Sequence, residues 1–203
     1  MKNLTELLEA TAALHRHLCP RQVLGVRMGM LAGQLLALDL PQPNKRLLTI
    51  VETDGCFADG VAVATNCWVG HRTLRVTDYG KVAATFVDTR TDRALRMAPR
   101  QDVRTVAARF ASAATNRWET QLLAYQAMPD DLLFQVQAVT LLDSIKKLVS
   151  KPGQRVNCVQ CGEEIINERG VLRDNQIWCQ ACAGQGYYHP LAEVALPVID
   201  LSN

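Results

Sequence analysis

Two Cys-x-x-Cys pairs constrain the fold of this chain more than any other feature of its sequence. Cys158 and Cys161 form the first pair, Cys179 and Cys182 form the second, and seventeen residues separate the pairs. This spacing lets two tight turns close around one tetrahedral zinc ion with four thiolate ligands. We therefore predict a zinc ribbon, in which Gly162 supplies the positive φ that a turn after the first pair often requires.

The predicted ribbon module comprises residues 156–203, including a C-terminal tail. Val171, Ile177 and Trp178 are expected to form a short hairpin between the two turns. So short a segment buries little apolar surface, and zinc binding should supply most of its stability, on the order of 10 kcal/mol. A four-cysteine site has no open coordination position, so this zinc would be structural. Two unrelated dithiols, or a redox-active pair, remain the alternatives.

Residues 1–145 alternate between helical and strand patterns, which predicts an α+β domain with helices packed on a mixed or antiparallel sheet. A polar stretch at 146–155 is expected to link this domain to the ribbon. Helical periodicity covers residues 3–14, 20–38, 56–68 and 101–127, and strand patterns cover residues 46–52, 72–78, 81–88, 93–97 and 132–142. Turn residues between the three middle strands predict an antiparallel meander.

The helix expected from residue 20 has two unusual features. Pro20 suits a first helical turn, and the residue before a proline is pushed out of helical geometry, so Cys19 is expected at the N-cap. Gly25, Gly29 and Gly33 follow at intervals of four. This spacing favours close backbone packing against a neighbouring element or subunit.

Histidines and cysteines also gather in the N-terminal domain. The segment LHRHLCP contains His15, His17 and Cys19, and Cys56 begins a later predicted helix. The positive end of a helix dipole favours a thiolate, which is a good metal ligand. We predict a second, open metal site formed by His17, Cys19 and Cys56, with His15 as a further candidate ligand.

Two other residues are weaker candidates for this site. Asp59 lies one helical turn after Cys56, where it could be a ligand or a hydrogen-bond acceptor for one. Cys67 lies eleven residues after Cys56, a helical rise of about 16 Å, so the two thiols cannot share an ion unless the helix breaks. In the alternative interpretation, these cysteines are buried small hydrophobic residues and the histidines are ordinary surface residues.

Composition excludes several classes of protein. The 203 residues are 48% hydrophobic, which is sufficient for a folded core, and the formal net charge of +2 is too small to predict nucleic-acid binding. No apolar run approaches the roughly 18 residues that a membrane-spanning helix needs. The first residues lack the apolar segment of a secretory signal. We therefore expect a cytoplasmic protein, without a membrane or nucleic-acid partner, whose thiols stay reduced.

Four segments, in order, resemble the FmdE family of proteins, which are associated with molybdenum or tungsten formylmethanofuran dehydrogenase. They are LHRHLCPRQVLGVRMG, VETDGCFADGVAVATNCWVG, DYGKVAATFVD and CVQCGEE…WCQACA. The resemblance implies an α+β domain with a C-terminal zinc ribbon and a homodimer. It also implies a metal-binding cleft built from the HxHxCP-like segment and the later cysteine.

Carried over to this sequence, the resemblance implicates the following residues: His15, His17, Cys19, Cys56, and, in matching blocks, Cys67 and Lys81. The chain departs from the family pattern at Arg16, where a glycine is expected, and at 66–68, where Asn-Cys-Trp replaces a Gly-Cys-Thr pattern. These changes keep the implied ligands and affect the width and access of the cleft.

Three functions are consistent with these residues. The first is a metal-binding accessory protein of molybdo- or tungsto-enzyme C1 metabolism, with a structural zinc and a second accessible divalent metal, zinc being one choice. The second is an enzyme in which that second metal polarises a carbonyl or activates water, with Lys81 or Asp59 carrying a proton. The third is a ribbon-mediated adaptor or transcription regulator.

Overall fold

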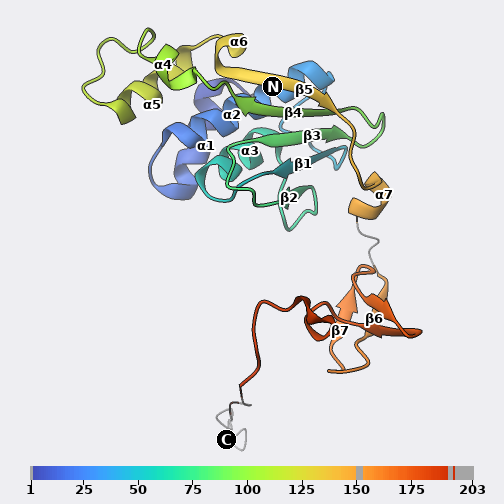
Figure 1. The fold of residues 1–203 in the computed structure, drawn as a ribbon. Coiled ribbons are helices and arrows are strands. Elements are labelled where there is room, and N and C mark those ends of the chain that lie inside the picture. Colours follow the sequence, from blue (N-terminus) through green and yellow to red (C-terminus); the bar gives the residue numbers. More distant parts are fainter. Residues whose placement is uncertain (1, 150–152, 192–193, 195–203) are drawn as a thin grey trace, which may run out of the picture. The chain divides into compact units, whose positions relative to one another are not determined.

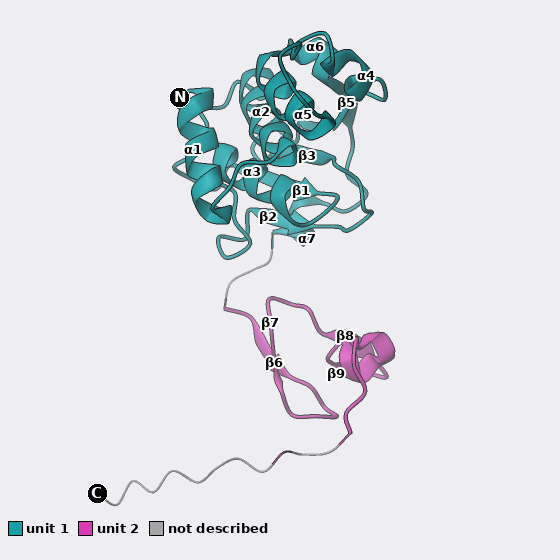
Figure 2. Ribbon diagram, turned by 90° about the vertical axis from the view of Figure 1, so that its left-hand side faces the viewer, with its two compact units in different colours: residues 1–149 teal, residues 150–203 magenta. Residues whose placement is uncertain are grey.

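The computed structural model describes residues 2–149, 153–191 and 194, and it divides the chain into two compact units (Figures 1 and 2). The units are Met1–Val149 and Ser150–Asn203. Part of the predicted linker and most of the predicted C-terminal tail lie outside the described residues. Within the described part of the predicted linker, residues 146–148 belong to the short helix Ile145–Leu148. The N-cap residue of this helix, Ser144, accepts a hydrogen bond from the Lys147 amide.

The larger unit contains seven described helices and five strands. The helices are α1 (Leu4–His15), α2 (Pro20–Leu36), α3 (Cys56–Thr65), α4 (Val103–Ala107), α5 (Arg117–Ala127), α6 (Asp130–Leu133) and α7 (Ile145–Leu148). The strands are β1 (Leu47–Val51), β2 (Leu74–Val76), β3 (Ala84–Asp88), β4 (Ala94–Pro99) and β5 (Phe134–Val139).

The two N-terminal helices begin where their capping residues predict. At α1, Asn3 accepts a hydrogen bond from the Glu6 amide, and the Glu6 carboxylate accepts one from the Asn3 amide. At α2, Cys19 is the extended N-cap residue, and Pro20 is the first helical residue. The buried side chain of Gln22 accepts a hydrogen bond from the Cys19 amide and donates one to the carbonyl of Thr11 in α1. This bridge fixes the chain between the two helices.

The five strands form one sheet in the order β2-β1-β3-β4-β5. Strand β1 pairs parallel with β2 and antiparallel with β3, and β3, β4 and β5 follow one another in antiparallel pairing. The expectation of a meander through the strands near 72–78, 81–88 and 93–97 is therefore wrong for the first of them, because β1 inserts between β2 and β3. The predicted mixed α+β architecture is correct.

Helices α2 and α3 pack closely enough that glycine is required on both. A β-carbon on Gly25 would lie 2.3 Å from the carbonyl oxygen of Phe57, and one on Gly60 would lie 2.4 Å from the carbonyl oxygen of Gln22. Gly29 likewise faces Ala64 of α3. The glycines on this face of α2 therefore allow close packing against α3 within the same chain, and their four-residue spacing gives no separate support for a dimer.

The region between β4 and β5 is less regular than predicted. The single helix expected over 101–127 is two helices, α4 and α5, with an irregular segment between them. The side chain of Asn116 accepts a hydrogen bond from the Glu119 amide, so a new helix begins there. Figures 1 and 2 show α4, α5 and α6 grouped at one end of the unit, near α2.

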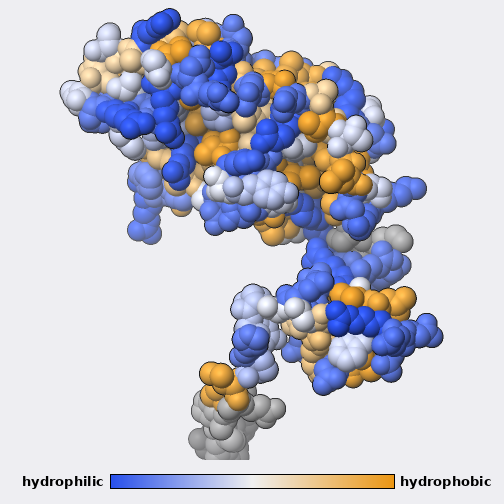
Figure 3. Space-filling model, in the orientation of Figure 1, coloured by the Kyte–Doolittle hydropathy of each residue, from blue (hydrophilic) through white to orange (hydrophobic). Residues whose placement is uncertain are grey.

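The main hydrophobic core lies between the sheet and helices α1–α3, with Phe57, Phe86 and Met97 fully buried. A small second cluster on the other face includes Leu48 and Val87, against which Ile145 of α7 packs. On the face of the molecule shown in Figure 3, hydrophobic patches alternate with strongly hydrophilic residues. No helix in the described ranges is both long and apolar enough to span a bilayer.

The smaller unit contains two hairpins. Strand β6 (Arg155–Asn157) pairs with β7 (Glu164–Ile166), and β8 (Val171–Arg173) pairs with β9 (Gln176–Trp178). The second hairpin is the predicted one, with Val171 opposite Trp178. A short helical turn at Ala181–Gln185 follows β9.

Candidate metal centres and an adjoining cavity

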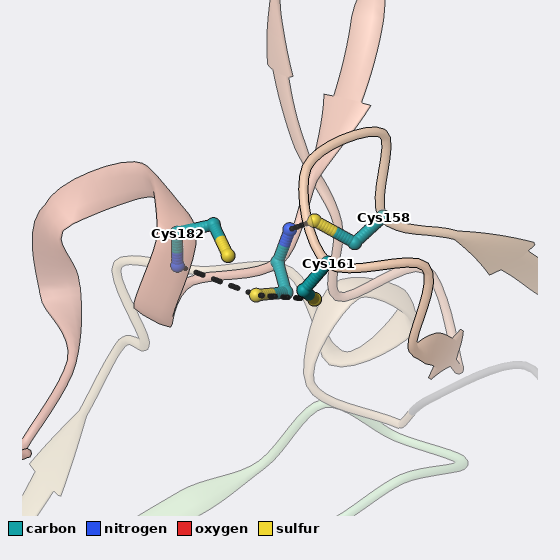
Figure 4. Close-up of side chains that lie close together, drawn as sticks. Cys158, Cys161 and Cys182 are labelled. Atoms are coloured by element: carbon teal, nitrogen blue, oxygen red, sulfur yellow. Dashed lines mark hydrogen bonds between the residues drawn. The ribbon is translucent and has the colours of Figure 1, made fainter. Parts of the chain in front are cut away.

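The ribbon brings its four cysteines together. The sulfur atoms of Cys158, Cys161, Cys179 and Cys182 all lie within 4.8 Å of one another. Figure 4 shows three of these side chains, Cys158, Cys161 and Cys182, pointing toward a common centre. The Cys161 and Cys179 sulfurs are 4.0 Å apart. Gly162, directly after the first pair, has a φ of 75°, as its predicted turn role requires.

Backbone amides in the ribbon point at sulfur. The Cys179 amide donates to the Cys158 sulfur at 3.2 Å, and the Cys182 amide donates to the Cys179 sulfur at 3.3 Å. Hydrogen bonds from the Cys161 and Cys179 amides lower the pKa of Cys158 to about 6. A hydrogen bond with the Cys179 sulfur, together with burial, raises the pKa of the Cys182 thiol to about 12.

This donor set fits zinc. Zinc–sulfur bonds of about 2.3 Å in a tetrahedron place sulfurs nearly 4 Å apart, and the ribbon sulfurs are already close to that separation. Hydrogen bonds from amides stabilise thiolate ligands, and a dication would offset their repulsion. The four-cysteine cluster could therefore hold a metal ion such as zinc.

The larger unit brings together two more cysteines. Cys19 is the N-cap of α2 and Cys56 is the first residue of α3. Burial raises the pKa of the Cys56 thiol, and the adjacent Cys19 thiol raises it further. Because α2 and α3 run side by side from these residues, the positive ends of two helix dipoles meet at the paired thiols.

Histidine and aspartate lie beside this pair. The Nε2 atom of His15, the last residue of α1, is hydrogen-bonded to the Oδ2 atom of Asp59, in the first turn of α3. The Nδ1–H of His17 donates to the carbonyl of His15 at 3.0 Å. In that tautomer the Nε2 atom of His17 keeps its lone pair for a ligand role.

These N-terminal side chains are neighbours without forming a closed cluster. In the part of the chain that the structure describes, only the ribbon cysteines form a group of three or more candidate ligands whose donor atoms all lie within 4.8 Å. An ion held by His17, Cys19 and Cys56 would therefore require side-chain rotation. The exposed position of His17 leaves room for such a rotation.

The two other residues implicated by the family pattern, Cys67 and Lys81, have different surroundings. Cys67 follows the C-terminal end of α3, the end opposite Cys56, and its sulfur is buried and accepts hydrogen bonds from Gln42 and Thr49. Burial raises the pKa of the Cys67 thiol. Lys81 is exposed, and its ammonium lies 5.8 Å from the centre of the Tyr79 ring.

A cavity of about 550 Å³ adjoins Cys19 and Cys56. Its walls come from the first turns of α2 and α3, from Val82 before β3, from the end of β4 and from the facing sides of α4 and α5. Trp118 and Tyr125 contribute aromatic surface from α5. The cavity is large enough for a small metabolite and places it beside the two thiols.

The arginines and aromatic residues of this cavity were not identified from sequence. Arg100, Arg104 and Trp118 lie in the irregular region between β4 and β5, more than forty residues from either cysteine. A basic and aromatic composition in 99–125 is the only sequence signal for them, and it does not show which wall they would line.

Comparison with known proteins agrees with this architecture. A crystal structure of a tungsten formylmethanofuran dehydrogenase FmdE-like protein from Syntrophus aciditrophicus has a TM-score of 0.61 and 24% sequence identity, covering 93% of this chain and 96% of that one. At this identity the likeness concerns the fold.

A sequence relative is described as a probable S-adenosyl-L-methionine-binding protein of Archaeoglobus fulgidus. It is 40% identical over 87 residues, which are 41% of this chain and 24% of that protein. The matched part of this chain thus spans about a quarter of the relative's length.

Residues 14–135 match the model of a family described as "FmdE, Molybdenum formylmethanofuran dehydrogenase operon". This range includes α2, α3, strands β1 to β4, the first two residues of β5, and both Cys19 and Cys56. The match covers more than half of the sequence, so this chain belongs to the FmdE family.

Proposed function

We propose that this protein is a metal-binding accessory protein of molybdo- or tungsto-enzyme C1 metabolism. In this proposal it carries a structural zinc in the ribbon and a second divalent ion at Cys19 and Cys56, and it acts in the cytoplasm. The observation that carries the proposal is the meeting of two helix-starting thiols beside an open cavity. Membership of the FmdE family supports the C1 context.

The local contacts support a metal at the thiol pair. With His17 rotated toward them, the two thiols and the Nε2 of His17 would supply a sulfur and nitrogen donor set that suits zinc and similar ions. The Asp59 carboxylate orients the His15 ring, a contact typical of residues that support metal ligands. A cation would also relieve the mutual effect of the adjacent thiols, which raises the pKa of Cys56.

Cobalt titration of the full-length protein under reducing conditions tests the second site. Cobalt(II) bound to thiolate absorbs in the near ultraviolet, so two classes of site should give two phases in the rise of absorbance with added cobalt. We expect Cys19→Ala with Cys56→Ala to remove one phase, and Cys161→Ala to remove the other. A single phase that depends only on the ribbon cysteines would refute the second site.

The accessory role is tested separately. The metal-loaded protein is mixed with purified molybdenum or tungsten formylmethanofuran dehydrogenase, and co-elution and dehydrogenase activity are measured. Metal-dependent association, lost in the Cys19 and Cys56 variant, is the expected result. The absence of association and of any effect on activity would contradict the accessory role. Size measurement of the protein alone tests the expected homodimer.

The cavity favours a second candidate function, a metal-dependent enzyme acting on a small C1-type substrate. An ion at Cys19 and Cys56 with an open coordination position would lie beside a space of metabolite size. Of the two predicted proton carriers, Asp59 lies in the first turn of α3 with Cys56, and Lys81 directly precedes Val82 in the cavity wall. Turnover of candidate C1 substrates by the metal-loaded protein alone would favour this function.

The cavity gives no support for S-adenosyl-L-methionine as the ligand. That molecule carries a sulfonium cation, whereas the described lining residues include three arginines and no acidic side chain. The archaeal relative with that description also shares only a quarter of its length with this chain.

A further inference from the structure

The charged side chains that line the cavity beside Cys19 and Cys56 are all positive. Arg21 reaches it from α2, Arg100 from the turn after β4, and Arg104 from α4. None of the described residues lining this cavity is an aspartate or a glutamate. This local excess contrasts with the formal net charge of only +2 for the whole chain.

Two of these arginines are available for a ligand. Arg100 forms an ion pair with Asp102 at 3.0 Å, so part of its charge is already compensated. Arg21 and Arg104 form no salt bridge with any described residue. Guanidinium groups present several donors in a planar fork that matches carboxylate and phosphate oxygens. The cavity therefore contains two uncompensated cations of the type that binds oxyanions.

The backbone adds to the positive electrostatic potential in the cavity. Helices α2 and α3, with 17 and 10 residues, both start at this cavity, and their N-terminal ends carry partial positive charge. The first turn of α2 contains no acidic residue, and the one acidic residue in the first turn of α3, Asp59, is hydrogen-bonded to His15. An anion in the cavity would thus face two helix N-termini in addition to the arginines.

The remaining wall is suited to an apolar group. Leu24 and Val82 line the cavity beside the aromatic rings of Trp118 and Tyr125. The Arg104 side chain lies close enough to Tyr125 to lower the pKa of its phenol, although burial raises that pKa overall. Apolar walls with a few convergent charged groups are typical of small-molecule sites.

We propose that this cavity binds a small organic anion, with its oxyanion held by Arg21 and Arg104 and a flat apolar portion against Leu24 and Trp118. This inference rests on the proposed function, because it names the class of ligand that would be presented to the second metal. A carboxylate and a phosphate monoester share the relevant chemistry, and the experiment separates them.

Calorimetric titration with a matched series of small probes tests the proposal on the full-length protein. Benzoate and phenyl phosphate carry a flat ring with a carboxylate or a phosphate, benzamide is the neutral analogue, and benzamidine is the cationic one. We expect benzoate or phenyl phosphate to bind at least roughly tenfold more tightly than benzamide, and benzamidine not to bind. The tighter of the two anions identifies the oxyanion that the site prefers.

Arginine variants locate the binding. Arg104→Gln and Arg21→Gln should each weaken the anion roughly tenfold, and Arg104→Lys should retain more affinity than Arg104→Gln because the charge remains. Arg90→Gln is the matched control, since Arg90 is an exposed arginine in the turn between β3 and β4. Circular dichroism of each variant checks that the fold is kept.

Titrations at one and at two equivalents of zinc separate this proposal from the proposed function. If no second zinc binds but the anion preference and its dependence on Arg104 persist, the anion site stands without the second metal. If a second zinc binds while benzoate, phenyl phosphate and benzamide bind equally or not at all, the anion proposal is overturned. Unchanged affinity in Arg104→Gln and Arg21→Gln would overturn it as well.

Discussion

Gly25 of α2 and Gly60 of α3 face each other where the two helices pack closely, and each of these helices has a cysteine at its N-terminal end. A β-carbon on Gly25 would lie 3.1 Å from the carbonyl carbon of Gly60. Because the helices run in the same direction from this contact, their N-terminal residues Cys19 and Cys56 are neighbours. A packing requirement in the core thus determines the spacing of the proposed metal ligands.

Replacing Gly60 by alanine should separate the two helices. The added carbon would collide with the Gln22 backbone, and we expect a loss of about 3 kcal/mol in the free energy of unfolding. Any folded Gly60→Ala protein should also bind the second metal more weakly, while the ribbon keeps its ion. Urea unfolding and metal analysis measure the two effects.

Gly70→Ala is the control for this substitution. A β-carbon on Gly70 meets nothing within 4 Å, and no positive φ is recorded there. We expect its stability to stay within about 0.5 kcal/mol of the unsubstituted protein. Equal stability of the Gly60 and Gly70 variants would contradict the packing argument.

Cys161→Ala should unfold the ribbon while leaving the larger unit intact. Three remaining thiolates would hold zinc far more weakly, and the ribbon depends on metal binding on the order of 10 kcal/mol. Zinc content should fall by one equivalent, and the smaller unit should become sensitive to protease. The control is Gln180→Ala, which lies between the ligands of the second pair and should retain zinc. A ribbon that stays folded in Cys161→Ala would argue against a structural ion.

Cys67→Ala should leave both metals bound. The Cys67 sulfur is buried and already hydrogen-bonded to Gln42 and Thr49, so its loss should cost about 1 kcal/mol of stability through packing alone. Metal analysis compares it with Cys56→Ala, which should lose one equivalent. A loss of metal from the Cys67 variant would show that the family pattern at this position concerns binding.

The protein should lose stability in acid, partly because the Asp88 carboxylate becomes protonated. Two hydrogen bonds from Arg46, at 2.8 and 2.7 Å, hold the pKa of this buried carboxyl well below its usual range. The unfolded value is about 3.9, so the contribution is complete above roughly pH 5 and is lost as the pH falls toward the lower folded pKa. Asp88→Asn should cost on the order of 2 kcal/mol at pH 7 and progressively less below pH 4.

Thermal unfolding between pH 7 and pH 3 measures this dependence. Asp143→Asn is the control, because Asp143 forms an exposed ion pair with Lys147 and its substitution should change stability by less than about 0.5 kcal/mol. A stability difference between Asp88→Asn and the unsubstituted protein that does not shrink in acid would contradict the assignment to the Asp88 charge.

Local sequence signals predicted much of this structure correctly. The capping pair at Asn3 and Glu6, the start of α2 after Cys19, and the four-cysteine ribbon each depend on residues close together in sequence or on a fixed spacing. The pairing of β2 with β1 depends on contacts between distant segments, so periodicity could not reveal it.

The same distinction applies to the site. Cys19 and Cys56 stood out because both precede or begin a helix, and the structure shows why they meet. The cavity wall formed by Arg104 and Trp118 could not be predicted, since it depends on where α4 and α5 return against α2.

Metal stoichiometry tests the central claim of two metal sites most directly. The full-length protein and the Cys19→Ala, Cys56→Ala double variant are loaded with zinc under reducing conditions, freed of excess metal, and analysed for zinc per chain. We predict two equivalents in the unsubstituted protein and one in the double variant. One equivalent in both proteins would contradict a second metal site at the thiol pair.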